Sequence, residues 1–416
     1  MKKVVYFHVP ERVHHIAHLD LDCFFVSVER IYDPSLIGQP VMVGGTPEGR
    51  GVVASASYEA RKFGVRSAMP TRQALALCPR LICVRGSFER YGEISSKLRR
   101  RLQELAPVVE QASIDEFYLD FTGCEKLYHN DLPAMMHTLK RLVRDEFQLP
   151  CSIGLATNKM LSKIAASAAK PNGVCVVPPG SEAAFLAPME IDVIPGIGAK
   201  TGERLRRAGY KTVADIQTKT IDTLRIHLGS MTEEMYRLAC GGGAVMLTPE
   251  HDRKSIGREE TFSRDRSGIA SLEPELFRLT ESVCGRLRSC GALARTVTLK
   301  LRYSDFTTVT RVESIEPTND DTIVFRTART LLERNYVSTR PVRLIGVSVS
   351  NLTDHAEPEL SLFPVENKRQ QIFDAVDKLR GKFGKEIIHV GGIAQEEEAN
   401  PRRRPMGEKN ARGKKT

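Results

Sequence analysis

The sequence lacks two features that define common classes of protein: paired cysteines and long apolar runs. Its nine cysteines are scattered, and none forms the Cys-x-x-Cys spacing of zinc or redox sites. This distribution favours reduced thiols and a cytoplasmic location. The apolar start at residues 4–7 is cut short by His8 and Pro10, which is not typical of a signal peptide, and no other segment approaches a membrane span. We therefore expect no membrane contact.

The composition is that of a globular protein with a basic balance of charge. Hydrophobic residues make up 41% and charged residues 27% of the 416 residues, which is typical of soluble folded domains. A chain of this length predicts roughly two to four domains. The 61 Lys and Arg against 51 Asp and Glu give a net charge of +10, which favours a polyanionic partner such as nucleic acid. A basic surface without a dedicated ligand would give the same charge.

The first 187 residues alternate between extended and helical patterns. Extended runs are predicted at 16–20, 41–43, 52–54, 108–110, 114–120 and 151–155, and helices at 24–31, 91–105, 135–147 and 159–169. Strands and helices that alternate in this way predict an α/β or α+β sheet domain.

The chain changes character after Pro188. A basic helical segment follows, and Gly241–Gly243 with the charged residues after it predicts a flexible linker. Beyond the linker, alternation at 296–303 and 342–349 and helical spacing at 273–287 and 322–334 predict an antiparallel sheet with helices on one face. The end of the chain, rich in Lys and Arg, is predicted to be a disordered basic tail.

Two acidic pairs are candidates for a carboxylate cluster. Asp20 and Asp22 lie near the end of one predicted strand, and Asp115 and Glu116 lie on another. Mg²⁺ prefers hard oxygen ligands, and carboxylates from two neighbouring strands could position two ions for in-line phosphoryl transfer. Apolar neighbours would half-bury these groups, which is costly without a cation. Either pair alone also fits a solvated loop or strand edge.

Phosphate-binding side chains follow a short way along the chain. Ser55, Tyr58, Arg61 and Lys62 lie on one stretch, and Lys170 lies after the predicted helix at 159–169. Arg offers bidentate contacts to phosphate, and Lys offers a point charge. A surface helix with ordinary basic residues is the alternative.

Two further segments indicate contacts with a DNA backbone. Gly196 and Gly198, followed by Lys200, form a turn like that of a helix-hairpin-helix, where backbone N–H groups approach a phosphate whatever the base sequence. A plain interhelical turn is the alternative. In the last domain a set of basic residues could track the backbone, or could only protect strand edges; the set is Lys254, Arg258, Arg295, Lys300 and Arg302.

Four ordered motifs, at residues 20–25, 58–70, 113–116 and 169–173, resemble those of the Y-family DNA polymerases. The resemblance runs from about His14 to Leu352. It implies a multidomain right-hand polymerase whose little finger is an antiparallel sheet with helices on one face. The implied domains are a palm at 14–29 and 86–187, small fingers at 30–85, a helical thumb at 188–243, a linker at 244–253, a little finger at 254–352 and a tail at 353–416.

The resemblance also implies an activity and roles for individual residues. The activity is low-fidelity translesion synthesis, in which two Mg²⁺ ions promote nucleotidyl transfer from a dNTP to the 3′-OH of a primer on template DNA. Asp20 and Asp115 would ligate both ions, the Leu21 carbonyl would assist, and Glu116 would support the ion nearer the primer. Phe25 would be the steric gate against ribose, although plain core packing also fits it. The remaining substrate contacts would be Phe24, Ser55, Tyr58, Arg61 and Lys170.

The tail resembles a clamp-binding peptide followed by a helix. Within Glu359–Phe363, the side chains of Leu360, Leu362 and Phe363 would enter a pocket on the sliding clamp, although Glu359 replaces the usual Gln. Ile372, Val376, Leu379 and Phe383 recur at helical spacing and predict an amphipathic helix that docks on its own little finger or binds a partner. We expect a monomer that is processive only with the clamp.

Two other functions remain alternatives to synthesis. One is a catalytically inactive polymerase-like adaptor that binds DNA and clamp, and the intact carboxylates argue against it. The other is a different two-metal palm enzyme such as a nucleotide cyclase, which would need neither the hairpin turn nor the clamp peptide.

Overall fold

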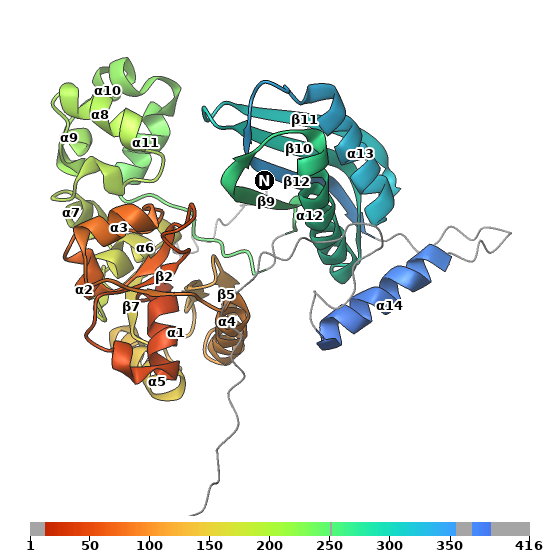
Figure 1. The fold of residues 1–416 in the computed structure, drawn as a ribbon. Coiled ribbons are helices and arrows are strands. Elements are labelled where there is room, and N and C mark those ends of the chain that lie inside the picture. Colours follow the sequence, from red (N-terminus) through yellow and green to blue (C-terminus); the bar gives the residue numbers. More distant parts are fainter. Residues whose placement is uncertain (1–12, 250–251, 355–367, 384–416) are drawn as a thin grey trace, which may run out of the picture. The chain divides into compact units, whose positions relative to one another are not determined.

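The structure is a computed structural model that describes residues 13–249, 252–354 and 368–383 (Figure 1). The chain divides into two compact units, Met1–Asp252 and Arg253–Thr416. Within the described residues, no helix combines the length and the apolar character needed to cross a membrane.

The first unit is built around a five-stranded sheet of order β5-β6-β1-β7-β8. Its strands are β5 (Val108–Gln111), β6 (Glu116–Asp120), β1 (Ile16–Leu21), β7 (Cys151–Ala156) and β8 (Val174–Val176). β1 is central, antiparallel to both β6 and β7, and buried along its whole length. The predicted strands 16–20, 108–110 and 151–155 are therefore confirmed, whereas β8 was missed.

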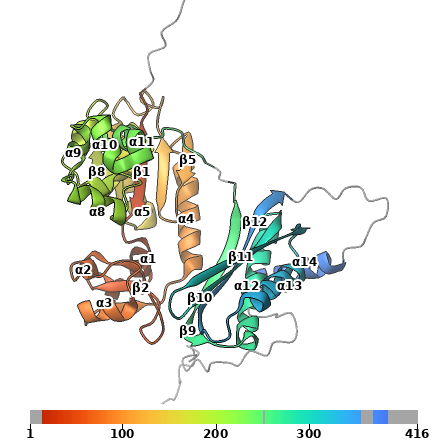
Figure 2. The same cartoon turned by 90° about the horizontal axis from the view of Figure 1, so that it is seen from above.

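Helices cover both faces of this sheet. Ala17, Leu19 and Leu21 of β1 join a core with α1 (Phe24–Tyr32), α4 (Phe88–Gln103) and α5 (Leu132–Phe147), and Figure 2 shows α4 alongside β5. Because side chains alternate along a strand, His18 and Asp20 point to the other face. There α6 (Lys159–Ala168) packs closely, since a Cβ added at Gly154 would lie 2.1 Å from the Ser162 carbonyl oxygen. The polar face of the sheet is thus held against one helix.

A second, smaller sheet lies within residues 30–85. Its order is β3-β2-β4, with β3 (Val53–Ala56) antiparallel and β4 (Ile82–Val84) parallel to β2 (Val41–Gly44). Short helices α2 (Tyr58–Arg61) and α3 (Thr71–Leu77) complete it, and residues such as Met42 and Val65 form its core.

A helical segment completes the first unit. It contains α7 (Glu182–Leu186), α8 (Ala199–Arg207), α9 (Val213–Gln217), α10 (Ile221–Leu228) and α11 (Thr232–Ala239), whose core is shared with α6. The chain after α11 was predicted to be a flexible linker. Instead, its backbone is hydrogen-bonded to the sheet region: the Gly241 carbonyl accepts from Asn158 at 2.8 Å, and the Thr248 N–H donates to Glu110 at 2.8 Å.

The second unit is an antiparallel sheet with helices on one face, as predicted. The order is β11-β10-β12-β9, formed by β9 (Ser255–Arg266), β10 (Ala292–Tyr303), β11 (Thr308–Thr318) and β12 (Val342–Asp354). Figure 1 shows α12 (Ile269–Ser289) and α13 (Asp321–Asn335) beside this sheet, and residues such as Leu276 and Leu332 bury against it.

The predicted helix near the C-terminus is α14 (Lys368–Phe383). It docks on α12 through ion pairs: Arg288 donates to Asp377 at 2.6 Å, and Arg380 donates to Glu281 at 2.7 Å. The predicted apolar stripe does not make these ion pairs, and three of its four members, Ile372, Leu379 and Phe383, are exposed, whereas Val376 is half-buried. Docking on its own domain is confirmed, but the face that docks is the neighbouring one.

Candidate active site

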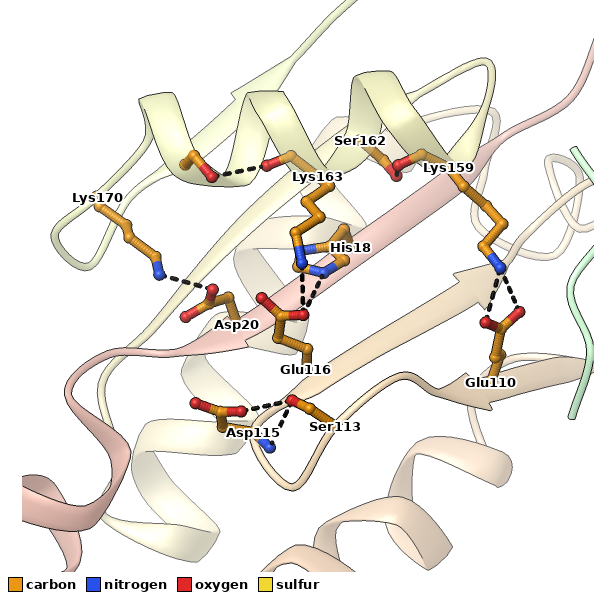
Figure 3. Close-up of polar contacts among 11 residues, drawn as sticks. His18, Asp20, Glu110, Ser113, Asp115, Glu116, Lys159, Ser162, Lys163 and Lys170 are labelled. Carbon is orange, nitrogen blue, oxygen red and sulfur yellow. Dashed lines mark hydrogen bonds and ion pairs between the residues drawn. The ribbon is translucent and has the colours of Figure 1, made fainter. Parts of the chain in front are cut away.

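Three carboxylates gather at one end of β1 and β6 (Figure 3). Asp20 on β1 pairs directly with Glu116 on β6 in the antiparallel register, so their side chains share one face of the sheet. The Leu21 N–H donates to the Asp115 carbonyl at 3.0 Å, which holds the turn before β6 beside the end of β1. Sheet pairing therefore brings together residues that are about a hundred positions apart in the sequence.

The position of Asp115 differs from the sequence prediction. It was placed within a strand at 114–120, but β6 begins only at Glu116. The preceding residues form a tight turn in which the N–H groups of Ala112 and Ser113 both donate to the Glu116 carbonyl. Within that turn, the Ser113 hydroxyl donates to the Asp115 carboxylate at 2.5 Å. Asp115 is consequently half-exposed, whereas Asp20 is buried.

Ammonium groups neutralise two of the three carboxylates. Lys170 donates to Asp20 at 2.6 Å, and Lys163 of α6 donates to Glu116 at 2.6 Å. Burial raises the pKa of Asp20, and the Lys170 ammonium offsets only part of that effect. His18 Nε2 lies 3.9 Å from Glu116 Oε2, and the His18 ring and the Lys163 ammonium together lower the pKa of Glu116 to about 2. The site thus favours a charged Glu116 and places a cation against a buried Asp20.

The expected triphosphate contacts lie in two groups. Tyr58 begins α2, and Arg61 ends it with its guanidinium 5.1 Å from the centre of the Tyr58 ring. Ser55 is buried on β3. Lys170 lies in the turn after α6, at Asp20. The sequence could not show how the residues of α2 are connected to Lys170. The connection is made by Asp22, whose carboxylate accepts a hydrogen bond from the Tyr58 hydroxyl at 2.7 Å.

Phe24 and Phe25 have different surroundings at the start of α1. Phe24 is buried in the core, whereas the half-buried Phe25 ring stacks on Tyr91 with ring centres 4.3 Å apart and an angle of 15°. The Tyr91 hydroxyl donates to the buried Glu29 at 2.6 Å, which fixes its ring. Offset-stacked aromatic pairs of this kind are stabilising beyond their burial. The position of Phe25 is therefore set by a second anchored ring.

Four residues near the site were missed as contributors by sequence reasoning. His18 could have been found, because it lies two positions before Asp20 on a predicted strand and so on the same face. Lys163 gave no signal, since a lysine that faces a sheet looks like any exposed helical lysine. Tyr91, which stacks on Phe25, and Ser152, whose hydroxyl donates to Asp22 at 2.9 Å, likewise resemble ordinary core residues until the tertiary contacts are known.

The glycine turn precedes α8 as expected. Gly196 has φ +95°, a backbone conformation that favours glycine, and Gly198 is the N-cap of α8. Lys200 is exposed in the first turn of that helix. This turn therefore places the first backbone N–H groups of α8 next to Gly198.

The basic residues of the second unit do not share one surface. Lys300 and Arg302 lie on the face of β10 away from the helices, where Lys300 is paired with Glu259 at 2.8 Å and Arg302 donates to Thr308 at 3.0 Å. Arg258 instead donates to Ser282 of α12 at 2.7 Å, so it reaches toward the helical side. Lys254 and Arg295 are both exposed. Leu360, Leu362 and Phe363 lie outside the described residues.

Carboxylates at the ends of two paired strands, with ammonium groups beside them, are the arrangement of a metal-dependent enzyme of phosphoryl or nucleotidyl transfer. Models of the impB/mucB/samB family match this chain in three places: the family itself at 19–167, its HHH motif at 179–210 and its C-terminal domain at 253–362.

Curated relatives and solved structures agree with these matches. DNA polymerase IV of Dehalococcoides mccartyi (strain 195) is 39% identical over 91% of this chain and 97% of its own. DNA polymerase IV of Halorhodospira halophila is 41% identical over 81% of this chain and 95% of its own. A Y-family DNA polymerase chimera of Dbh and Dpo4 superposes with a TM-score of 0.72 at 28% identity, over 82% of this chain and 99% of that one. An insertion ternary complex of Dbh DNA polymerase gives a TM-score of 0.60 at 27% identity, with the same coverage.

The chain therefore belongs to the impB/mucB/samB family of Y-family DNA polymerases. Its activity is that of this family, DNA-directed translesion DNA synthesis, and none of the comparisons supports the inactive adaptor. Membership of the family also implies dependence on a divalent metal.

Proposed function

We propose that this chain adds dNTPs to a primer 3′-OH on template DNA by a two-Mg²⁺ reaction at Asp20, Asp115 and Glu116. The observation that carries the proposal is the direct pairing of Asp20 with Glu116 across β1 and β6, each with an ammonium at 2.6 Å. Strand ends hold such groups rigidly, which in-line transfer requires.

The donor set is suited to Mg²⁺. Within the residues described, no three His, Cys, Asp or Glu side chains already surround a common ion position. Mg²⁺ usually takes only one or two protein carboxylates and completes its octahedron with water and substrate phosphates. The raised pKa of the buried Asp20 indicates a carboxylate that a cation would stabilise. When bound, the ions would lower the pKa of the primer hydroxyl and neutralise charge that develops on the phosphates.

The chain's own side chains would then bind and orient the nucleotide. Lys170, released from Asp20, turns its ammonium toward the triphosphate, and Arg61 supplies a bidentate guanidinium from α2. Glu116, whose pKa is lowered, holds its charge in a partly buried site, where electrostatic effects are stronger than in water.

Phe25 would exclude ribonucleotides. Its ring stacks on Tyr91, and the surface of this stacked ring would leave no space for a 2′-OH. Because a planar ring held from behind cannot move aside, discrimination is steric and does not depend on recognition of a base. Phe24 contributes by packing in the core behind this surface.

Further contacts would hold the DNA and the clamp. The turn at Gly196 and Gly198 with Lys200 would bind a backbone phosphate, and Lys254, Arg295, Lys300 and Arg302 would add sequence-independent contacts. Leu360, Leu362 and Phe363 would enter a pocket on the sliding clamp. The protein would be a monomer, and its cytoplasmic location stays a prediction.

The test is primer extension on an undamaged template with Mg²⁺ and all four dNTPs. The natural chain is compared with the Asp115→Ala, Glu116→Ala double variant and with Asp145→Ala, Glu146→Ala, an exposed acidic pair in α5 with the same charge change. Extension that is lost only in the first variant supports the assignment. If the first variant extends primers as well as the natural chain, these carboxylates are not the catalytic ones.

A further inference from the structure

Asp22 is a buried carboxylate that the proposed reaction leaves without a role. It directly follows β1, two residues after Asp20, and its exposed fraction is only 1%. The Tyr58 hydroxyl donates to its Oδ1 at 2.7 Å. The Ser152 hydroxyl and the Asn172 backbone N–H donate to its Oδ2 at 2.9 and 2.7 Å. Three segments that are distant in the sequence therefore meet at one side chain.

All three of these donors are neutral groups. Burial of a carboxylate is costly unless hydrogen bonds replace its water, and bonds to a charged acceptor are roughly twice as strong as those between neutral groups. Burial, and then the hydrogen bond to Asp22, raise the pKa of Tyr58, so the phenol keeps the proton that it donates. The backbone of Asp22 is also fixed, because its N–H donates to the Pro150 carbonyl at 2.9 Å and its carbonyl accepts from Ser27 at 2.7 Å.

Each partner of Asp22 lies next to a residue of the proposed nucleotide site. Tyr58 underlies the Arg61 guanidinium, and Asn172 lies two residues after Lys170. Ser152 pairs directly with Asp20 in the register of β1 and β7. The Asp22 carboxylate thus connects the two segments that carry cations to the strand that carries a catalytic carboxylate.

The phenol of Tyr58 has a single O–H to donate, and Asp22 accepts that hydrogen bond. While this bond lasts, the Tyr58 hydroxyl cannot also donate to a phosphate. Its ring nevertheless supports Arg61 through a cation–π contact at 5.1 Å. Tyr58 is therefore placed to hold Arg61 in position between Asp22 and the nucleotide.

We propose that Asp22 is a positioning residue for the incoming nucleotide, which acts by holding Tyr58 and Asn172 so that Arg61 and Lys170 converge on the triphosphate. The inference rests on the proposed function, because that function assigns Arg61 and Lys170 to the triphosphate. It adds a residue that touches neither the metal nor the substrate.

The test measures single-nucleotide incorporation by the full chain on a primer–template, with the KM for dNTP, kcat and the Kd for DNA determined separately. Asp22→Ala removes all three acceptor contacts. A displacement of about 1 Å in a binding group costs roughly 10²-fold, so we expect kcat/KM for dNTP to fall by about that factor. The rise in KM should carry much of this loss, with Kd for DNA unchanged.

Two variants separate positioning from general structural damage. In Asp22→Asn the amide oxygen can still accept from Ser152 and Asn172, while the amide NH₂ donates to the Tyr58 oxygen. Since hydrogen bonds between neutral groups are about half as strong as those to a charged group, the loss in kcat/KM for dNTP should stay below ~10-fold. Asp120→Ala is the matched control. Asp120 ends β6 and accepts from the Thr122 N–H at 2.8 Å, so its removal costs a local bond away from the nucleotide. Its KM for dNTP should equal that of the natural chain.

A double-mutant cycle with Tyr58→Phe tests the route of action. Because Asp22 acts partly through Tyr58, the two losses in kcat/KM should be less than additive on a free-energy scale. The idea is overturned if Asp22→Ala leaves the KM for dNTP within twofold. If Asp22→Ala does not fold, an unchanged KM in Tyr58→Phe overturns it. A natural chain that fails to extend primers would instead refute the proposed polymerase site, so the two failures are distinguishable.

Discussion

At the scale of single residues, the same side chain serves different purposes two positions apart. Asp20 and Asp22 are both buried carboxylates, but Asp20 contacts an ammonium and Asp22 contacts neutral donors. Strand alternation does not separate them, since both positions have the same parity. The two residues differ because β1 ends at Leu21, so that Asp22 lies in the turn toward α1. A carboxylate that faces a cation can exchange it for a metal, whereas one saturated by hydroxyl and N–H donors fixes the backbone around it.

The positions of the proposed catalytic carboxylates on the sheet could be predicted from the sequence because their setting is local. Acidic residues within apolar, extended runs indicate strand ends, and this information lies within a few positions of Asp20 and Glu116. Their partners could not be predicted in the same way. Lys163 and Lys170 meet the carboxylates only after α6 packs on β1 and β7, a contact that depends on the small size of Gly154.

Substitution of the proposed steric gate should change sugar selection. In Phe25→Val the smaller side chain leaves space for a 2′-OH, so the preference for dNTP over rNTP should fall by roughly 10²-fold. The measurement is single-nucleotide incorporation with each matched pair of sugars. The rate with dNTP on the same protein is the internal control. Unchanged discrimination would leave Phe25 as a packing residue only.

The pKa of Glu116 should depend on the Lys163 ammonium beside it. Its pKa of about 2 lies below the ordinary value of about 4.3, so it contributes stability above the unfolded value, and this is lost as pH falls toward 2. In Lys163→Met the ammonium at 2.6 Å is removed, and the pKa of Glu116 should rise toward its ordinary value. Carboxyl-carbon NMR titration of both proteins measures this directly. Equal titration midpoints would show that Lys163 does not stabilise the charged form.

At the scale of elements, the predicted strands and helices were those with strong periodicity. β10 and β12 alternate apolar and polar residues because one face packs on α12 and α13. β9 and β11 were missed. They are edge strands whose side chains are mostly exposed and often charged, as in Arg258, Glu259 and Glu260, so their sequences carry little apolar alternation. Edge strands are defined by their pairing partners, which the local sequence does not specify.

The contact between β7 and α6 should be sensitive to a single methyl group. In Gly154→Ala the added Cβ would lie 2.1 Å from the Ser162 carbonyl oxygen and 2.3 Å from the Ala166 nitrogen, both backbone atoms, so α6 must move. We expect a loss of about 3 kcal/mol in the free energy of unfolding and weaker primer extension, because Lys163 moves with the helix.

The matched control is Gly92→Ala in α4, where nothing lies within 4 Å of the added Cβ. Alanine is the better helix former, so this variant should gain up to about 1 kcal/mol. Thermal and denaturant unfolding of both variants measure the two effects. A Gly154→Ala protein as stable as the natural chain would show that α6 is not held at this distance.

At the scale of the whole molecule, the two compact units carry different parts of the proposed function. The first holds the carboxylates, the cations and the glycine turn, and the second presents a basic strand face and the docked α14. The order of the units along the chain was predictable from changes in composition. The face of the sheet to which each basic side chain belongs could not be predicted. Arg258, Lys300 and Arg302 have the same charge and similar spacing but different neighbours.

Arg258 reaches toward the helical side of the sheet, whereas Lys300 and Arg302 lie on the opposite face. Their substitution should therefore affect DNA binding differently. Each phosphate contact adds about 0.9 to the slope of log K against log[salt] for duplex DNA. Lys300→Ala with Arg302→Ala removes two basic groups from the helix-free face of β10, so the slope should become shallower by up to ~1.8, with similar losses on unrelated sequences. Arg258→Ala is the control, and it removes one positive charge where the double variant removes two. Its guanidinium reaches Ser282 of α12, so the slope should stay within measurement error of the natural chain. Fluorescence anisotropy on a primer–template over a range of salt concentrations decides between them. A larger change for Arg258→Ala than for the double variant would place the DNA against the helical side of this sheet.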